Sequence, residues 1–142
     1  MSRVAMVNLA WGFFMIFMSG CGGAFVALRA SEAFISGPIT PQWETVLQAS
    51  SHGHTALFGV IHILLGLTIP YARSSRSHDR LKSLAIFAGS FAMGPLLLIR
   101  ASLGPTLSTE LNGILMGVAL SCALLGILFH AIGLLSRVSF RS

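Results

Sequence analysis

The sequence is poor in charged side chains, and above all in acidic ones. Of its 142 residues only 9% are charged and four are Asp or Glu, whereas 54% are hydrophobic. The mean hydropathy is +0.82. Because a water-soluble globular chain carries about 25% charged residues, these 142 residues cannot form a sizeable soluble domain, such as a separate nucleotide-binding or hydrolytic domain. The composition is that of an integral membrane protein.

Four apolar runs are long enough to span a bilayer, which takes roughly 17 to 25 residues of helix. They predict an all-α fold, a single four-helix transmembrane bundle over residues 1–142. The helices are expected at about 4–28, 52–71, 83–99 and 111–135. The intervening residues, 29–51, 72–82 and 100–110, are expected to form loops.

The cations are distributed unevenly over these segments. With four spans, the N-terminus, the middle loop and the C-terminus share one side, where most Lys and Arg fall: Arg3, Arg73, Arg76, Arg80, Lys82, Arg137 and Arg141. The other side has Arg29 and Arg100 with three acids, Glu32, Glu44 and Glu110. The positive-inside rule therefore predicts an inner (cytoplasmic) membrane protein with both termini cytoplasmic. It also explains the net charge of +5 without nucleic-acid binding.

Cysteine is scarce as well. Cys21 and Cys122 both fall in predicted helices, so we expect no disulfide, and no CxxCH motif is present to attach a c-type haem. The segment Met18-Ser19-Gly20-Cys21 resembles a lipoprotein cleavage site. However, the apolar run continues to Leu28, where a lipoprotein would have a polar tether, and we expect no cleavage.

The predicted helix interiors contain no Asp, Glu, Lys or Arg, so histidine is the residue type there that can carry a positive charge or ligate a haem iron through nitrogen. That absence argues against a carboxylate proton relay or an ion-coupled transporter. Four histidines fall in the helices: His52, His54, His62 and His130. One intramembrane His is often only a hydrogen bonder between helices, which is what we expect of His130. Three within eleven residues predict a cofactor site.

Helical geometry separates the first two histidines. His52 and His54 are about 200° apart around the helix, so they point to opposite faces and cannot share one metal ion. Neutral imidazole in apolar, acid-free surroundings suits haem b better than a hard cation. His62, about 12 Å further along the helix axis, is a second candidate ligand. Phe58 would pack on a porphyrin or on the next helix.

Arg29 and Arg100 are the cations nearest to this histidine pair, at the outer ends of their helices. They are candidates for binding the propionates of a haem. The alternative is that both long side chains simply extend to the membrane interface.

Two stretches carry a resemblance to known families. Ser51-His52-Gly53-His54-Thr55-Ala56-Leu57-Phe58-Gly59 resembles the HxH helix of haem-copper oxidase and nitric oxide reductase catalytic subunits, in which two histidines ligate two different haems. Trp11-Gly12-Phe13-Phe14-Met15-Ile16-Phe17, Trp43 and His52 resemble small four-helix proteins of the styrene oxide isomerase type, and more faintly the hydroxylaminobenzene mutases. The resemblance implies that His52 ligates haem b between the subunits of a homotrimer, whose twelve helices equal the number in an oxidase catalytic subunit.

The departures from the isomerase pattern shape the functional prediction. Phe58, Gly89 and Leu97 stand where the isomerase has a polar Asn, Asp and Tyr. The resemblance to the oxidase HxH helix then implies a single-module relative of the haem-copper oxidases, with redox or small-gas chemistry at the haem and an unidentified electron donor. Two alternatives stay open, a Lewis-acid isomerase or mutase acting on a lipophilic epoxide or hydroxylamine, and a cofactor-free accessory membrane subunit. Whether the protein is an enzyme is likewise open.

Overall fold

The computed structural model describes residues 1–37, 42–72, 74–105 and 110–138, and this part of the chain is entirely helical apart from short connections. Two long helices come first, α1 (Arg3–Ser36) and α2 (Gln42–Thr68), the latter extended by a 3₁₀ turn, Ile69–Tyr71. The third span comprises α3 (Arg76–Phe91), a π-helical turn (Ala92–Leu96) and α4 (Leu97–Ser102). The last is α5 (Leu111–Val138). The predicted all-α class is confirmed for the described residues.

The helices are longer than their apolar runs. The prediction of a loop over residues 29–51 is wrong, because 29–36 continue α1 and 42–51 belong to α2. The third span begins seven residues earlier than predicted, with Ser75 as its N-cap. Hydropathy marks only the stretch that lies in lipid, whereas a helix continues until a residue stops it. For α1 that residue is Gly37, which adopts a left-handed φ of 84°.

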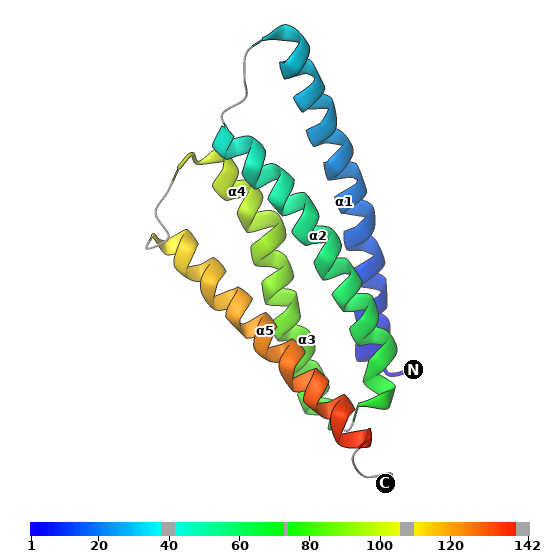
Figure 1. Cartoon of the computed structure of the whole chain (residues 1–142). Helices are drawn as coiled ribbons and strands as arrows, with labels where there is room; N and C mark the ends of the chain where they lie inside the picture. Colours follow the sequence, from blue (N-terminus) through cyan, green and yellow to red (C-terminus); the bar gives the residue numbers. More distant parts are fainter. Residues whose placement is uncertain (38–41, 73, 106–109, 139–142) are drawn as a thin grey trace.

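The helices form a layered bundle (Figure 1). α1 packs mainly on α2, α2 on the α3–α4 span, and α5 on α3. The starts of α1 and α3 and the end of α5 lie at one end of the bundle. This end, called the terminal end below, therefore carries Arg3, Arg76, Arg80, Lys82 and Arg137. Arg73 and Arg141 lie outside the described residues.

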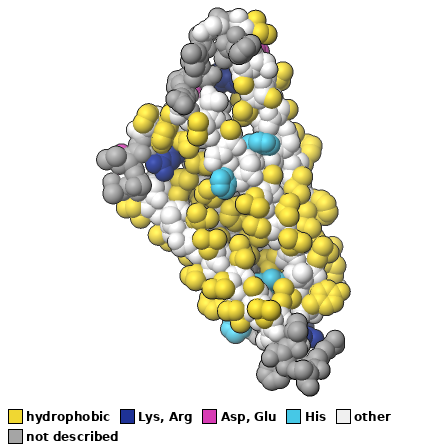
Figure 2. Space-filling view, viewed as in Figure 1, with side chains coloured by type: hydrophobic (Ala, Val, Ile, Leu, Met, Phe, Trp, Pro, Cys, Tyr) yellow, Lys and Arg dark blue, Asp and Glu magenta, His cyan; other side chains and the backbone are white. Residues whose placement is uncertain are grey.

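The surface is consistent with a multi-pass membrane protein. Four helical segments are long and apolar enough to cross a membrane: Arg3–Glu32, Trp43–Tyr71, Arg76–Ser102 and Leu111–Arg137. Figure 2 shows hydrophobic side chains over the middle of the molecule and Lys and Arg only towards its ends. Large apolar side chains such as Phe13, Phe17, Leu84 and Phe129 are more than 60% exposed, as expected for residues that face lipid.

Pro95 lies inside the π-helical turn of the third span. Proline cannot donate the backbone hydrogen bond of a regular helix, and a widened turn accommodates it. The Gly94 carbonyl oxygen in this turn accepts a hydrogen bond from the Ser51 hydroxyl at 2.9 Å. A Cβ atom on Gly94 would lie 3.1 Å from Thr55 Oγ1. The turn and α2 are thus tied together at the level of the HxH segment.

Glycines let the backbones of α1 and α2 approach each other closely. A Cβ atom on Gly12 would lie 2.6 Å from the Gly59 carbonyl oxygen, and one on Gly66 would lie 2.8 Å from the Ala5 carbonyl oxygen. Small residues at such crossings are typical of helix pairs in membranes, where packing and interhelical hydrogen bonds replace the hydrophobic effect. The pairing of α1 with α2 therefore depends on these positions.

Gly12→Ala should destabilise the fold by about 1–3 kcal/mol, because the new methyl group meets the backbone of α2 and cannot be accommodated by a side-chain movement. Unfolding of the protein in mild detergent, followed by circular dichroism during an SDS titration, measures this loss. Gly22→Ala is the matched control, since a Cβ atom there meets nothing within 4 Å. Equal stability of the two variants would show that the close crossing does not matter.

Candidate cofactor-binding site

His52 lies in the seam between α1 and α2, with its ring held from one side. Its Nδ1 lies 2.8 Å from the Ser19 carbonyl oxygen and 2.9 Å from Ser19 Oγ. The Ser19 hydroxyl in turn donates to the His52 carbonyl oxygen at 3.0 Å. A carbonyl oxygen only accepts, so Nδ1 of the neutral ring carries the proton and Nε2 keeps its lone pair. A backbone carbonyl on Nδ1 is the arrangement that orients metal-ligating histidines.

Gly23 provides the surface on which the His52 ring lies. A Cβ atom at Gly23 would lie 2.6 Å from Cε1, 2.9 Å from Nε2 and 3.0 Å from Nδ1 of that ring. These nearly equal distances place the Cβ position over the flat face of the imidazole. Any side chain larger than glycine would therefore push the ring away from α1.

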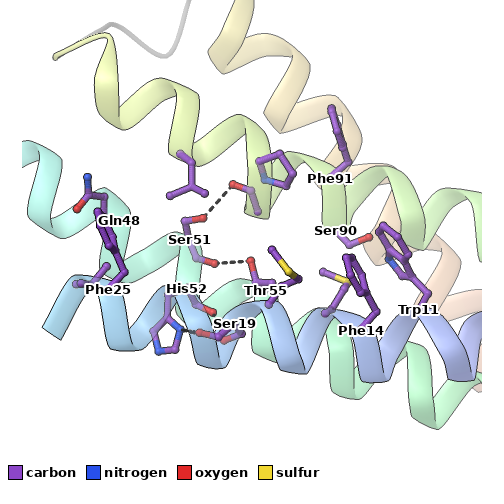
Figure 3. A pocket seen from close by; sticks show the side chains of 17 residues that line it. Trp11, Phe14, Ser19, Phe25, Gln48, Ser51, His52, Thr55, Ser90 and Phe91 are labelled. Carbon is purple, nitrogen blue, oxygen red and sulfur yellow. Dashed lines mark hydrogen bonds between the residues drawn. The ribbon is translucent and has the colours of Figure 1, made fainter. Parts of the chain in front are cut away.

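An apolar cavity of about 430 Å³ lies beside His52 (Figure 3). Three spans form it, namely α1, α2 and the α3–α4 span, whereas α5 contributes no lining residue. Aromatic side chains line it from two of these spans, namely Trp11, Phe14, Phe25 and Phe91. Its few polar groups are uncharged: Ser19, Gln48, Ser51, His52, Thr55 and Ser90. The volume and the lining are typical of a site for an apolar ligand.

His54, on another side of α2, also uses Nδ1 to bond a backbone carbonyl, but this carbonyl belongs to α2 itself. Its Nδ1 donates to the Ser50 carbonyl oxygen at 2.7 Å, which again leaves the lone pair on Nε2. Within the described part of the chain, Nε2 of neither His52 nor His54 has a hydrogen-bond partner. Both rings are half-buried. His54 does not line the cavity beside His52, in keeping with the predicted separation.

The two candidate arginines lie on different sides of α2. Arg29 is exposed, and its guanidinium is 5.9 Å from the ring centre of Phe25, which lines the cavity. Arg100 is half-buried, with its guanidinium 5.7 Å from the ring centre of Trp43. Trp43 precedes His54 by eleven residues, so the two lie within about 20° on the same face of α2. The structure thus associates Arg29 with the cavity and Arg100 with the His54 side.

His62 lies in the core, apart from the other two. It is fully buried, its Nδ1 is 2.7 Å from Asn8 Oδ1, and its Nε2 is 3.2 Å from Ser90 Oγ. Asn8 Nδ2 donates to the Val4 carbonyl oxygen and to Ser83 Oγ. This network joins α1, α2 and α3 and engages both ring nitrogens. In this arrangement His62 is a structural hydrogen bonder and offers no nitrogen to a ligand.

Phe58 is also a core residue. It is 4% exposed, belongs to the cluster with Leu65, Ile86 and Ala123, and contacts the site of a Cβ atom on Gly89. It does not line the cavity beside His52. The structure therefore places Phe58 against the next helix, which is one of its two expected positions.

His130 belongs to a second polar cluster, at the terminal end. Its Nε2 is 2.7 Å from Thr68 Oγ1, and its Nδ1 is 3.4 Å from Lys82 Nζ. Lys82 also forms an ion pair with Asp79 at 2.9 Å. Both charged residues lie within α3, one with 7% and the other with 13% of its side chain exposed. The first turns of this helix thus hold the buried ion pair that hydropathy had assigned to a loop.

The residues that position the site have no sequence signature of their own. Ser19 and Gly23 lie 33 and 29 residues from His52, and neither belongs to a motif that indicates a cofactor site. The described residues contain no group of three or more His, Cys, Asp or Glu that would hold a metal ion. Cys21 and Cys122 are free and exposed. Comparison with known family models, curated proteins and solved structures finds no match.

Asn8→Leu should destabilise the protein by about 1–3 kcal/mol, because it leaves Nδ1 of the buried His62 and the buried Ser83 hydroxyl without their Asn8 partner. Asn112→Leu, at a half-buried position near the start of α5, is the control. The measurement is again the free energy of unfolding in detergent. In the double variant with His62→Leu the losses should be less than additive, and strict additivity would contradict the network.

Proposed function

We propose that this protein binds haem b in the membrane through His52 Nε2. The observation that supports the proposal best is the ring's hydrogen bonding, because the Ser19 carbonyl fixes the tautomer that leaves Nε2 able to bind a metal. The cavity beside the ring accounts for the choice of an apolar cofactor. A hard cation would need carboxylate or carbonyl ligands, and the cavity lining has no carboxylate.

The lining residues fit the faces of a porphyrin. Trp11, Phe14 and Phe25 offer aromatic surface, and Gly22 and Gly94 leave room between the helices. Arg29, close to the Phe25 ring, is the cation available to a propionate on this side. We assign the cofactor to this cavity on that basis, with His52 as ligand.

We further propose a homotrimer with the haem covered at a subunit interface. A single copy walls the cavity with three spans, and a wide apolar cofactor needs cover on its remaining side. α5 is the least buried of the four spans and has ample apolar surface for contacts with another copy or with lipid. The trimer itself comes from the resemblance to the styrene oxide isomerase type.

Both termini are proposed to be cytoplasmic, in the inner membrane. Of the described charged residues at the terminal end, five are cations and one, Asp79, is an acid. Short cytoplasmic loops carry such an excess of Lys and Arg. With this orientation, His52 and His54 lie nearer to the outer face.

The chemistry we propose is redox or small-gas chemistry. A bound haem would supply an iron for electron transfer or for binding a diatomic molecule. The chain's own residues orient His52 and exclude water with aromatic side chains. The Ser51 and Thr55 hydroxyls already donate to carbonyl oxygens at Gly94 and Ser51. Once His52 is bound to the iron, the lining would offer no other imidazole, carboxyl or amino group as a general acid or base, which suits this chemistry.

Epoxide isomerisation is the less favoured alternative. Phe58, Gly89 and Leu97, which replace the polar residues of the isomerase type, are buried against neighbouring helices and do not line the cavity. No polar group is therefore offered to a substrate from these positions.

His52→Ala should abolish or severely reduce haem incorporation, because the cavity lining contains no other histidine, cysteine or tyrosine to replace it. His54→Ala is the matched control and should keep the haem of this cavity, since the two rings lie on different sides of α2. The haem content of both variants is measured from the absorption spectrum and the haem-to-protein ratio after expression with ample haem. Full haem content in His52→Ala, or colourless wild-type protein, would overturn the proposal.

Gly23→Ala should lower the haem content strongly while changing stability little, because the methyl group displaces a movable side chain and not a backbone. Gly20→Ala, where a Cβ atom meets nothing within 4 Å, should keep full haem content. The haem-to-protein ratio and an SDS unfolding titration separate the two effects. Unchanged haem in Gly23→Ala would mean that the ring does not need its position against α1.

A further inference from the structure

A second cavity lies between α3 and α5 at the terminal end. Its volume is about 610 Å³. The start of α3 forms one wall, and one side of α5 forms the other. Gly126 and Gly133 lie among its α5 residues. This cavity shares no lining residue with the one beside His52.

The lining of this cavity is amphipathic along its length. Ser74, His78, Lys82 and Ser136 lie towards the end of the bundle. Further into the membrane-spanning region it is lined by Cys122, Leu125 and Phe129. A ligand that matches both ends has a polar head at the membrane boundary and an apolar chain directed into the bilayer.

The charge around the polar end favours an anion. Asp79 is the one acid at this end within the described residues, and Lys82 already neutralises it at 2.9 Å. Arg76 and Arg137 are exposed at the same end, whereas Arg80 lines a separate pocket between α1 and α3. The surroundings of the polar end are therefore positively charged overall.

We propose that this cavity binds an anionic phospholipid, with the phosphate headgroup at His78 and Ser136, which lie within two residues of Arg76 and Arg137, and an acyl chain against Leu125 and Phe129. Basic recesses between membrane helices are known to accept such headgroups. A soluble phosphate ester would leave the apolar walls unmatched. A second copy of the chain offers no free acid at this level, because Asp79 is already paired.

The headgroup is tested with purified full-length protein in mild detergent and two lipids, phosphatidylglycerol and phosphatidylcholine. Native mass spectrometry should show phosphatidylglycerol bound about tenfold more tightly. His78→Glu should weaken that binding by about fivefold, the effect of one charge near the headgroup. Ser77→Glu adds the same charge at the neighbouring exposed residue, which lies outside the cavity. It should weaken phosphatidylglycerol binding by less than about twofold, because the charge is further from the headgroup.

The acyl chain is tested by narrowing the apolar part. Cys122→Trp should weaken phosphatidylglycerol binding, whereas Ser121→Trp, at the next residue and outside the lining, should leave it unchanged. Equal binding of the two lipids would overturn the proposal, as would equal losses in either pair of variants. Competition by glycerol phosphate at equal concentration would indicate a site for soluble phosphate esters instead. Dissociation of an oligomer by Cys122→Trp with unchanged lipid binding would indicate a second copy.

Discussion

The close approach of α1 and α2 is the contact on which the rest of the structure depends. In a membrane, apolar side chains gain little by leaving lipid, so helix pairs are held by tight packing and hydrogen bonds between helices. Gly12, Gly59 and Gly66 bring the two backbones together along most of the seam. The same approach places the Ser19 carbonyl oxygen 2.8 Å from His52 Nδ1 and the bare surface of Gly23 under its ring. The candidate ligand is thus positioned by the helix crossing itself.

Hydrogen bonding distinguishes the histidines from one another. An unpaired polar group in lipid is costly, and most polar side chains of this bundle are paired. His62 and His130 use both ring nitrogens in networks that join three helices. His52 and His54 each use only Nδ1 among the described residues, and each does so with a backbone carbonyl. Nε2 of His52 and Nε2 of His54 are therefore the ring nitrogens that remain able to bind a metal ion. This contrast separates the structural histidines from the candidate functional ones.

The two cavities differ in the elements and the side chains that line them. The cavity beside His52 lies where α1, α2 and the π-helical turn at Pro95 meet. Ser74, His78, Lys82 and Ser136 make one end of the cavity between α3 and α5 polar. The first cavity is almost wholly apolar and the second is amphipathic. Their linings accordingly suit different ligands, a flat apolar cofactor and an anionic lipid.

The all-helical class, the four apolar spans and the placement of His52 and His54 on opposite sides of one helix could be predicted from the sequence. These features depend on local composition and on the helical repeat, which a single stretch of chain contains. The helix ends were missed because hydropathy reports which residues lie in lipid, and the buried Lys82 was missed for the same reason. The core position of His62 and the contacts of Ser19 and Gly23 with His52 could not be predicted in this way. These contacts join residues 29 to 54 positions apart, and they form only when the helices cross.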